Sequence, residues 1–93
     1  MPVGLLTLEL HIAEAQSLKD KRQVLRSLKE RLRGHFNVAI AELDHQDTWQ
    51  RSVVGVVTLS NEERYVEEAL QKVLAEAERI LGPALISHAV EFV

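Results

Sequence analysis

The chain has 93 residues, a length that suits a single domain spanning residues 1–93. Apolar residues make up 46% of it, which is enough apolar surface to offset the entropy of the chain and argues against a disordered protein. There is no cysteine, which excludes disulfides and thiolate chemistry. Met1 to Glu14 lack a basic leader with a cleavage site, and no apolar run approaches the ~18 residues of a spanning helix. We therefore expect a cytoplasmic protein with no membrane partner.

Residues 3–12 predict a strand, because apolar side chains recur at every second position and make the even-numbered side the better core face. A helix follows, with Ser17 as its N-cap and Asp20 as an imperfect capping-box partner. Leucines spaced along one face, from Leu18 to Leu32, are typical of a buried helical stripe, and Gly34 is expected to end the helix in a left-handed conformation.

Residues 36–41 alternate again and predict a second strand, which runs into a polar turn at residues 44–48. Residues 49–59 predict a third strand that is apolar on both faces. Ser60 and Glu63 form a capping box for a second helix, which Gly82-Pro83 ends, and residues 84–93 close the chain as a fourth strand. This order predicts an α+β, ferredoxin-like β-α-β-β-α-β sandwich, with an antiparallel sheet of order 4-1-3-2 and both helices on one face.

Charge is unevenly distributed over the two predicted helices, although the net charge is only −3. Residues 17–33 hold seven of the eleven basic residues, whereas residues 61–81 hold six glutamates. Spacings of three and four place five of the cations on one exposed stripe, with Lys21 beside it. The candidate nucleic-acid contacts are Lys19, Lys21, Arg22, Arg26, Lys29 and Arg33. A second possibility is that this face is simply solvated.

The start of the first helix is also a candidate anion site, because free backbone N–H groups after Ser17 would lie near cations. Its residues are Ser17, Lys19, Lys21 and Arg22. The polar turn is a candidate interaction loop, in which a carboxylate beside His45 would orient the imidazole for proton transfer or metal binding. A histidine in such a turn also occurs for turn geometry alone. The loop residues are Asp44, His45, Gln46, Asp47, Trp49, Gln50 and Arg51.

Enzymatic activity has no positive support in the sequence, and we expect no catalytic residue, no cofactor and no metal. A glycine-rich phosphate loop, a nucleophile elbow and paired zinc ligands are all missing from the sequence. Base stacking on the sheet, as in RNA-recognition modules, is disfavoured because the first strand has no aromatic residue and the third offers only Trp49. The apolar strands leave one sheet face uncovered, which predicts a homodimer or larger homo-oligomer through that face or a sheet edge.

Three ordered motifs carry a family resemblance: residues 17–22, residues 36–39, and residues 44–51. In these motifs the chain resembles the YlxP-like family of small bacterial proteins of unknown function. The resemblance implies a ferredoxin-like fold, a cytoplasmic location and genes often found beside translation and ribosome-maturation factors. It marks Ser17, Leu18, Lys19, Lys21 and Arg22 in the first motif and Asp44 to Asp47 with Trp49 to Arg51 in the last.

Three hypotheses follow. In the first, the chain is a binding module for RNA or the ribosome that uses the basic stripe for phosphate contacts. In the second, it is a self-associating regulatory or scaffolding protein, with a small molecule between subunits as one option. A third hypothesis, an enzyme that uses His45 and a neighbouring aspartate, has the weakest basis.

Overall fold

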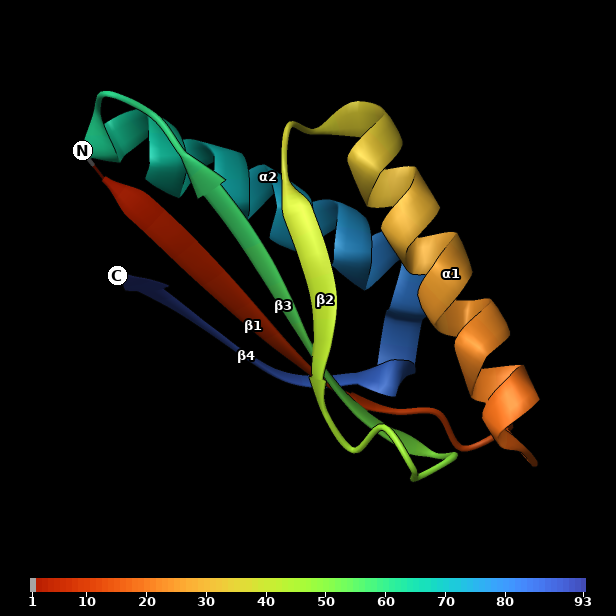
Figure 1. Cartoon of the computed structure of the whole chain (residues 1–93). Coiled ribbons are helices and arrows are strands. Elements are labelled where there is room, and N and C mark those ends of the chain that lie inside the picture. Colours follow the sequence, from red (N-terminus) through yellow and green to blue (C-terminus); the bar gives the residue numbers. More distant parts are fainter. Residues whose placement is uncertain (1) are drawn as a thin grey trace.

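The structure is a computed structural model that describes residues 2–93, and it is a sheet of four strands with two helices on one face (Figure 1). Its elements are β1 (Val3–His11), α1 (Leu18–His35), β2 (Ala39–Asp44), β3 (Arg51–Leu59), α2 (Glu63–Leu81), the short 3-10 turn η1 (Gly82–Ala84) and β4 (Leu85–Phe92). The strand order is β2-β3-β1-β4, and every neighbouring pair is antiparallel. This is the predicted order read from the opposite edge, so the ferredoxin-like prediction is confirmed.

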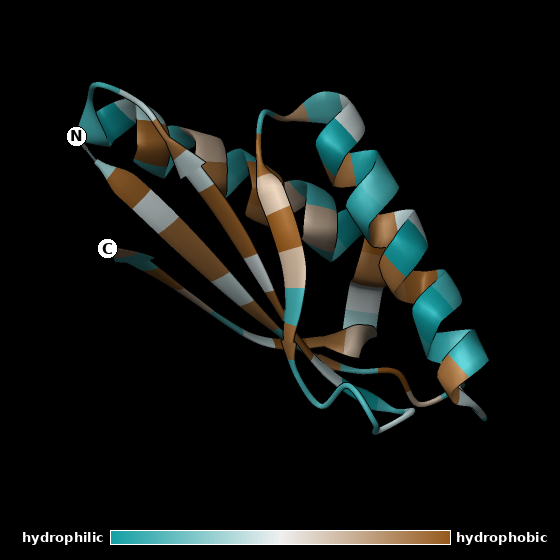
Figure 2. Cartoon of the chain, in the orientation of Figure 1, coloured by the Kyte–Doolittle hydropathy of each residue, from teal (hydrophilic) through white to brown (hydrophobic). Residues whose placement is uncertain are grey.

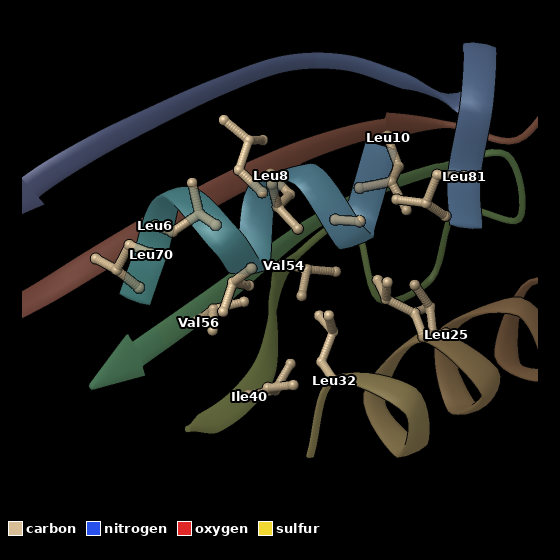
Figure 3. Packing of buried hydrophobic residues seen from close by; sticks show 14 of the residues in the cluster. Leu6, Leu8, Leu10, Leu25, Leu32, Ile40, Val54, Val56, Leu70 and Leu81 are labelled. Carbon is tan, nitrogen blue, oxygen red and sulfur yellow. The ribbon is translucent and has the colours of Figure 1, made fainter. Parts of the chain in front are cut away.

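The core lies between the helices and one face of the sheet (Figure 3). Leu6, Leu8 and Leu10 of β1 are fully buried, which confirms the even-numbered side of this strand as its core face. Val54 and Val56 of β3 lie on the same face, and this settles which side of β3 meets the helices. Burying one such side chain contributes about 1.5–3 kcal/mol, so these strands supply much of the stability.

The helix ends agree only in part with the sequence predictions. Ser17 caps α1 as expected, since its Oγ accepts from the Asp20 backbone N–H at 3.1 Å. The Gly34 prediction is wrong: α1 continues through His35, and Phe36 follows in an extended conformation with φ −135°. The predicted capping box of α2 is also wrong, because the helix begins at Glu63 and no side chain caps it. Gly82 ends α2 at φ 55°, as predicted.

Gly4 brings α2 close to the backbone of β1. A Cβ atom added at Gly4 would lie 2.5 Å from Cγ1 of Val66 and 2.8 Å from Cδ1 of Leu70. Glycine at this position therefore lets the first two turns of α2 rest on the strand without an intervening side chain.

Neither helix of residues 2–93 covers the opposite face of the sheet. Figure 2 shows apolar residues along β1 and β3, whereas most of α1 is hydrophilic. The odd-numbered residues of β1 point to the open face, among them Val3 and Leu5, and their partners Leu59 and Val57 of β3 lie beside them. Across residues 2–93, no helix is long and apolar enough to cross a membrane.

Candidate anion-binding surface and the buried lysine beside it

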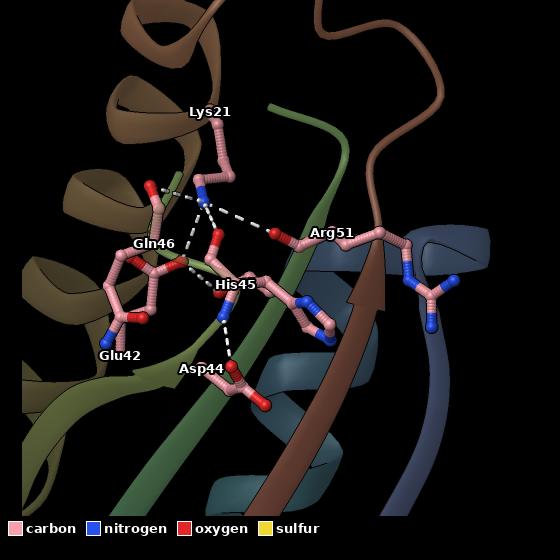
Figure 4. A network of polar contacts seen from close by, with 7 residues as sticks. Lys21, Glu42, Asp44, His45, Gln46 and Arg51 are labelled. Atoms are coloured by element: carbon pink, nitrogen blue, oxygen red, sulfur yellow. Dashed lines mark hydrogen bonds and ion pairs between the residues drawn. The ribbon is translucent and has the colours of Figure 1, made fainter. Parts of the chain in front are cut away.

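Lys21 points into the protein instead of toward solvent, although it lies on the basic helix α1. The residue is 0% exposed. Its Nζ donates to Glu42 Oε2 at 2.9 Å and to the His45 carbonyl at 2.6 Å (Figure 4). The carbonyls of Gln46 and Arg51 lie further from Nζ, at 3.4 and 3.3 Å. An ammonium has three N–H donors, so the two short bonds are well formed and the two long contacts share the remaining donor.

Glu42 and Ser52 complete this buried polar cluster. Ser52 is fully buried and its Oγ donates to Glu42 Oε2 at 2.7 Å, so this one oxygen accepts from both Ser52 and Lys21. The Glu42 side chain is 15% exposed, whereas that of Lys21 is 1% exposed. A buried charge without such partners would cost several kcal/mol. The cluster therefore joins α1 to the hairpin of β2 and β3, and Lys21 is not available to an external phosphate.

The sequence predictions missed Glu42 and Ser52, although a signal for them existed. Glu42 lies two residues after the buried Ile40, and Ser52 lies two residues before the buried Val54. Alternation in a strand therefore places both polar side chains on the core face. Lys21 lies four residues before the buried Leu25, which places it on the core side of α1.

The loop between β2 and β3 supplies backbone carbonyls to this cluster. His45 adopts a left-handed conformation, with φ 66°, and its N–H donates to Asp44 Oδ1 at 2.7 Å. The Thr48 N–H donates to the His45 carbonyl at 3.1 Å, which closes the turn. Within the part of the chain that the structure describes, no group of three or more His, Asp or Glu side chains could hold a metal ion. The loop thus presents its backbone inward.

Gln50 and Arg51 attach the other side of the loop to β1 and its neighbouring segment. Gln50 Nε2 donates to the carbonyls of Ala13 and Ala15, both at 3.1 Å. Arg51 Nη2 lies 3.1 Å from Glu9 Oε1. The structure therefore brings the two candidate motifs, residues 17–22 and 44–51, into one network. Trp49 remains 51% exposed at its rim.

The candidate anion site at Ser17 is not assembled as predicted. Ser17 Oγ is occupied by the Asp20 N–H, and Asp20 Oδ2 accepts from the Gln16 N–H at 3.0 Å. A carboxylate thus lies at the first turn, where an incoming anion would need to bind. With Lys21 turned inward, Lys19 and Arg22 are the cations of the proposed set that remain on the surface.

The remaining stripe is accessible along α1. Arg22, Arg26 and Arg33 are exposed, Lys29 is half-buried, and Lys19 is exposed near the start of the helix. Beside them lies a groove of about 500 Å³ between α1 and β2, lined by Arg22, Leu25, Arg26, Lys29, Glu30, Arg33 and Glu42. Arg33 Nη2 also donates to the Ile40 carbonyl of β2 at 3.2 Å.

No ion pair within residues 2–93 neutralises these five surface cations. The ion pairs found there are Lys21–Glu42, Arg51–Glu9, Arg64–Glu68 and Arg79–Glu76, and none involves the stripe. The groove walls therefore carry uncompensated positive charge, with Glu30 and the partly neutralised Glu42 as the negative groups along it. This surface can attract an anion.

A family model described as "Protein of unknown function (DUF503)" matches residues 3–89. The chain belongs to the DUF503 family. A curated relative, the "Uncharacterized protein YlxP" of Bacillus subtilis (strain 168), is 42% identical over 73 residues, which are 78% of this chain and 79% of that protein. The resemblance to YlxP-like proteins is therefore confirmed, and with it the membership of a family whose function is unknown.

Two solved structures share the fold of this DUF503 protein. One is a C-terminal segment of the alpha subunit of aIF2 from Pyrococcus abyssi, with a TM-score of 0.53 and 13% identity. The similarity covers 100% of the DUF503 chain but 51% of that structure, so this chain spans about half of its length. The other is a dimeric ferredoxin-like protein of unknown function from Thermobifida fusca, with a TM-score of 0.53 and 15% identity over 98% of this chain and 90% of that one. At these identities the likeness shows the fold alone.

Proposed function

We propose that this DUF503 protein is a cytoplasmic binding module that contacts RNA, free or within the ribosome, through the phosphate backbone. The contacts are Lys19, Arg22, Arg26, Lys29 and Arg33. The observation that supports this proposal is the accessible row of cations on α1, which no carboxylate within residues 2–93 pairs with. Lys21, first included in this set, is excluded from it because its ammonium is buried.

The surface favours shape recognition over base recognition. Fourteen residue steps separate Lys19 from Arg33, which corresponds to about 21 Å along a helix. No aromatic side chain lies on β1, and Trp49 precedes β3, so the open sheet offers no platform for stacked bases. Contacts restricted to phosphates position a protein on a nucleic acid without reading its sequence, and double-stranded RNA is recognised largely in this way.

The test is binding of a fluorescently labelled RNA hairpin, measured by anisotropy over a series of salt concentrations. Because each phosphate contact releases counterions, the affinity of the wild-type protein should fall with increasing salt. The Arg26→Glu variant should weaken binding at low salt by at least about tenfold and reduce the log–log salt slope by about one.

Arg64→Glu is the matched control, because Arg64 is an exposed arginine on α2 and the variant makes the same change of net charge. It should leave both the affinity and the slope unchanged. Three results would overturn the proposal: no binding by the wild-type protein at low salt, binding without a salt slope, or equal weakening by the two variants.

Self-association without nucleic-acid binding is the second candidate function, and the uncovered apolar sheet face favours it. In this case the protein acts as a regulatory or scaffolding module. Arg26→Glu separates the two candidates, because it should remove RNA binding under the first and leave the assembly intact under the second.

A further inference from the structure

The open face of the sheet has an apolar centre. Its two edges differ in how far their side chains project from the sheet. Val3 and Leu5 of β1 and Val53 and Val57 of β3 are only half-buried, and Leu59 is 60% exposed. This centre lies on the two middle strands of the sheet, β1 and β3. A patch of this kind, left uncovered, is typical of a protein interface.

At the β2 edge of this face, the side chain of Leu43 projects from the sheet. Its Cδ1 atom lies 2.7 Å from the position that a Cβ of Gly55 would take, so the leucine leans over the middle of β3. Leu43 is nevertheless 50% exposed and forms the wall of an apolar depression of about 170 Å³ that also contacts Leu5 and Val57. At the opposite edge, β4 carries only small side chains at the corresponding positions along the strands. They are Ala89 beside Thr7 and Ser87 beside Glu9.

Along the two central strands, charge is confined to one end of the same face, while Glu91 of β4 lies at the sheet edge beside Leu5. Arg51 and Glu9 form an ion pair whose side chains are 44% and 40% exposed. The other end of the two central strands carries Val3 opposite Leu59 and is apolar. The two central strands therefore run from a charged end to an apolar end.

We propose that a second copy of this chain covers the open face in a symmetric dimer, with a twofold axis that runs parallel to the strands between β1 and β3. This arrangement rests on the self-association proposed above and specifies its geometry. The axis places β3 over the partner's β1 and β2 over the partner's β4. Leu43 then faces the partner's Ala89 and Ser87, so a projecting side chain meets a low edge.

The same axis makes the charged ends complementary. Arg51 of each copy comes within reach of the partner's Glu9, and the apolar ends at Val3 and Leu59 meet each other. A twofold axis perpendicular to the strands would instead press Arg51 and Glu9 onto the partner's Leu59 and Val3. That packing removes charged groups from water without an opposite charge from the partner, which is costly. Charge complementarity therefore selects the parallel axis.

The face is large enough for a specific contact. With strands about 4.8 Å apart and a rise of about 3.3 Å per residue, the sheet measures roughly 19 by 30 Å. Two such faces bury at least about 1,100 Å² together, close to the ~1,200–2,000 Å² of stable complexes. Two sheets packed in this way form an aligned sandwich about 10 Å thick at its centre.

The first experiment measures the mass of the protein by sedimentation at about 1 to 100 µM. The wild-type protein should be dimeric at the upper end of this range. Ala89→Arg should weaken the dimer at least tenfold, because its side chain would meet the partner's Leu43. Ala75→Arg, which adds the same charge at an exposed position on α2, should change the dissociation constant less than twofold.

The second experiment uses charge reversal and native mass spectrometry. Glu9→Arg alone and Arg51→Glu alone should both be largely monomeric, because each gathers four like charges at one end of the interface. A mixture of the two variants should form a heterodimer, since every cross-contact is then attractive. Both variants break the ion pair within the chain, so that internal pair cannot account for recovery in the mixture.

The outcomes separate the geometry from self-association itself. A wild-type protein that stays monomeric at 100 µM overturns both the proposed dimer geometry and self-association. A wild-type dimer that Ala89→Arg leaves intact, or variants that do not associate when mixed, overturns the proposed axis and face while self-association stands.

Discussion

Helices α1 and α2 use their charged side chains differently. On α2, Arg64 Nε lies 3.8 Å from Glu68 Oε1 and Arg79 binds Glu76, so cations and carboxylates of one helix partly neutralise each other. On α1, the five cations of the stripe have no carboxylate partner within residues 2–93, while Lys21 of the same helix is fully buried. Exposed ion pairs contribute only about 0–1 kcal/mol to the free energy of folding, and the stripe on α1 lacks even these pairs. Folding stability therefore does not explain the stripe. Its charges are available to something outside the helix.

Both helices pack on the sheet through buried apolar side chains, and each has one further attachment of a different kind. Helix α1 is additionally attached through the Lys21 ammonium, which reaches β2 and the hairpin loop. Helix α2 packs directly on the backbone of β1 at Gly4. The attachment at Lys21 requires the ammonium and its hydrogen-bond partners together. The close packing at Gly4 requires that this position has no side chain. Replacing each attachment therefore tests this difference.

Lys21→Met should give the largest effect. The substitution removes the ammonium while Glu42 stays 85% enclosed beside Ser52, so a carboxylate loses its charged partner. Breaking a buried pair costs about 3–5 kcal/mol, and the opening of Glu42 toward the groove places this case near 3 kcal/mol. The free energy of unfolding in urea measures this loss.

Lys19→Met is the matched control for that prediction, because it makes the same change two residues away on the exposed side of α1. It should change stability by less than about 0.5 kcal/mol. Equal, small losses in both variants would show that the Lys21 cluster does not attach the helix.

Gly4→Ala should give a smaller loss, of about 1–2 kcal/mol. The new methyl group would meet Val66 and Leu70 at distances that require these side chains to shift. Overpacking of a core costs about 1–3 kcal/mol, and the better strand propensity of alanine offsets part of this. Gly34→Ala is the control, since nothing lies within 4 Å of a Cβ there and φ is not positive. It should be neutral or stabilising in the same urea measurement.

The sequence was sufficient for the fold because local rules and the global pattern agree. Alternation of apolar residues in β1 predicted its core face, and Ser17 predicted the start of α1. The helix ends at Gly34 and Ser60 were predicted wrongly, because capping preferences are weak compared with the packing that sets where a helix stops. These errors do not affect the sheet order.

The candidate site was only partly predictable. The stripe follows from helical spacing. Lys21 was wrongly counted with it because of its charge, although its position four residues before the buried Leu25 places it on the core side of α1. Glu42 is separated from Lys21 by 21 residues, so their pairing depends on the register of β2 against β3, which alternation alone does not fix. The joining of the two motifs into one network is therefore a result of the tertiary structure.

The smallest expected effect concerns the neutralised charges of α2. The hydrogen bond from Arg79 lowers the pKa of Glu76 below its ordinary value, and the nearby charges of Arg79, His35 and Arg31 lower it further. A depressed carboxyl pKa stabilises the fold above the pKa of the unfolded chain, and this contribution is lost as pH falls through the folded-state value.

Arg79→Gln should therefore raise the pKa of Glu76 toward its ordinary value, which a carboxyl-carbon NMR titration measures directly. Arg64→Gln removes a cation near the other end of α2 and should leave the pKa of Glu76 unchanged. Because both groups of the pair are at the surface, sodium chloride should reduce the difference between wild type and Arg79→Gln. If the pKa of Glu76 were the same in wild type and Arg79→Gln, α2 would not neutralise its own charges. The contrast with α1 would then disappear.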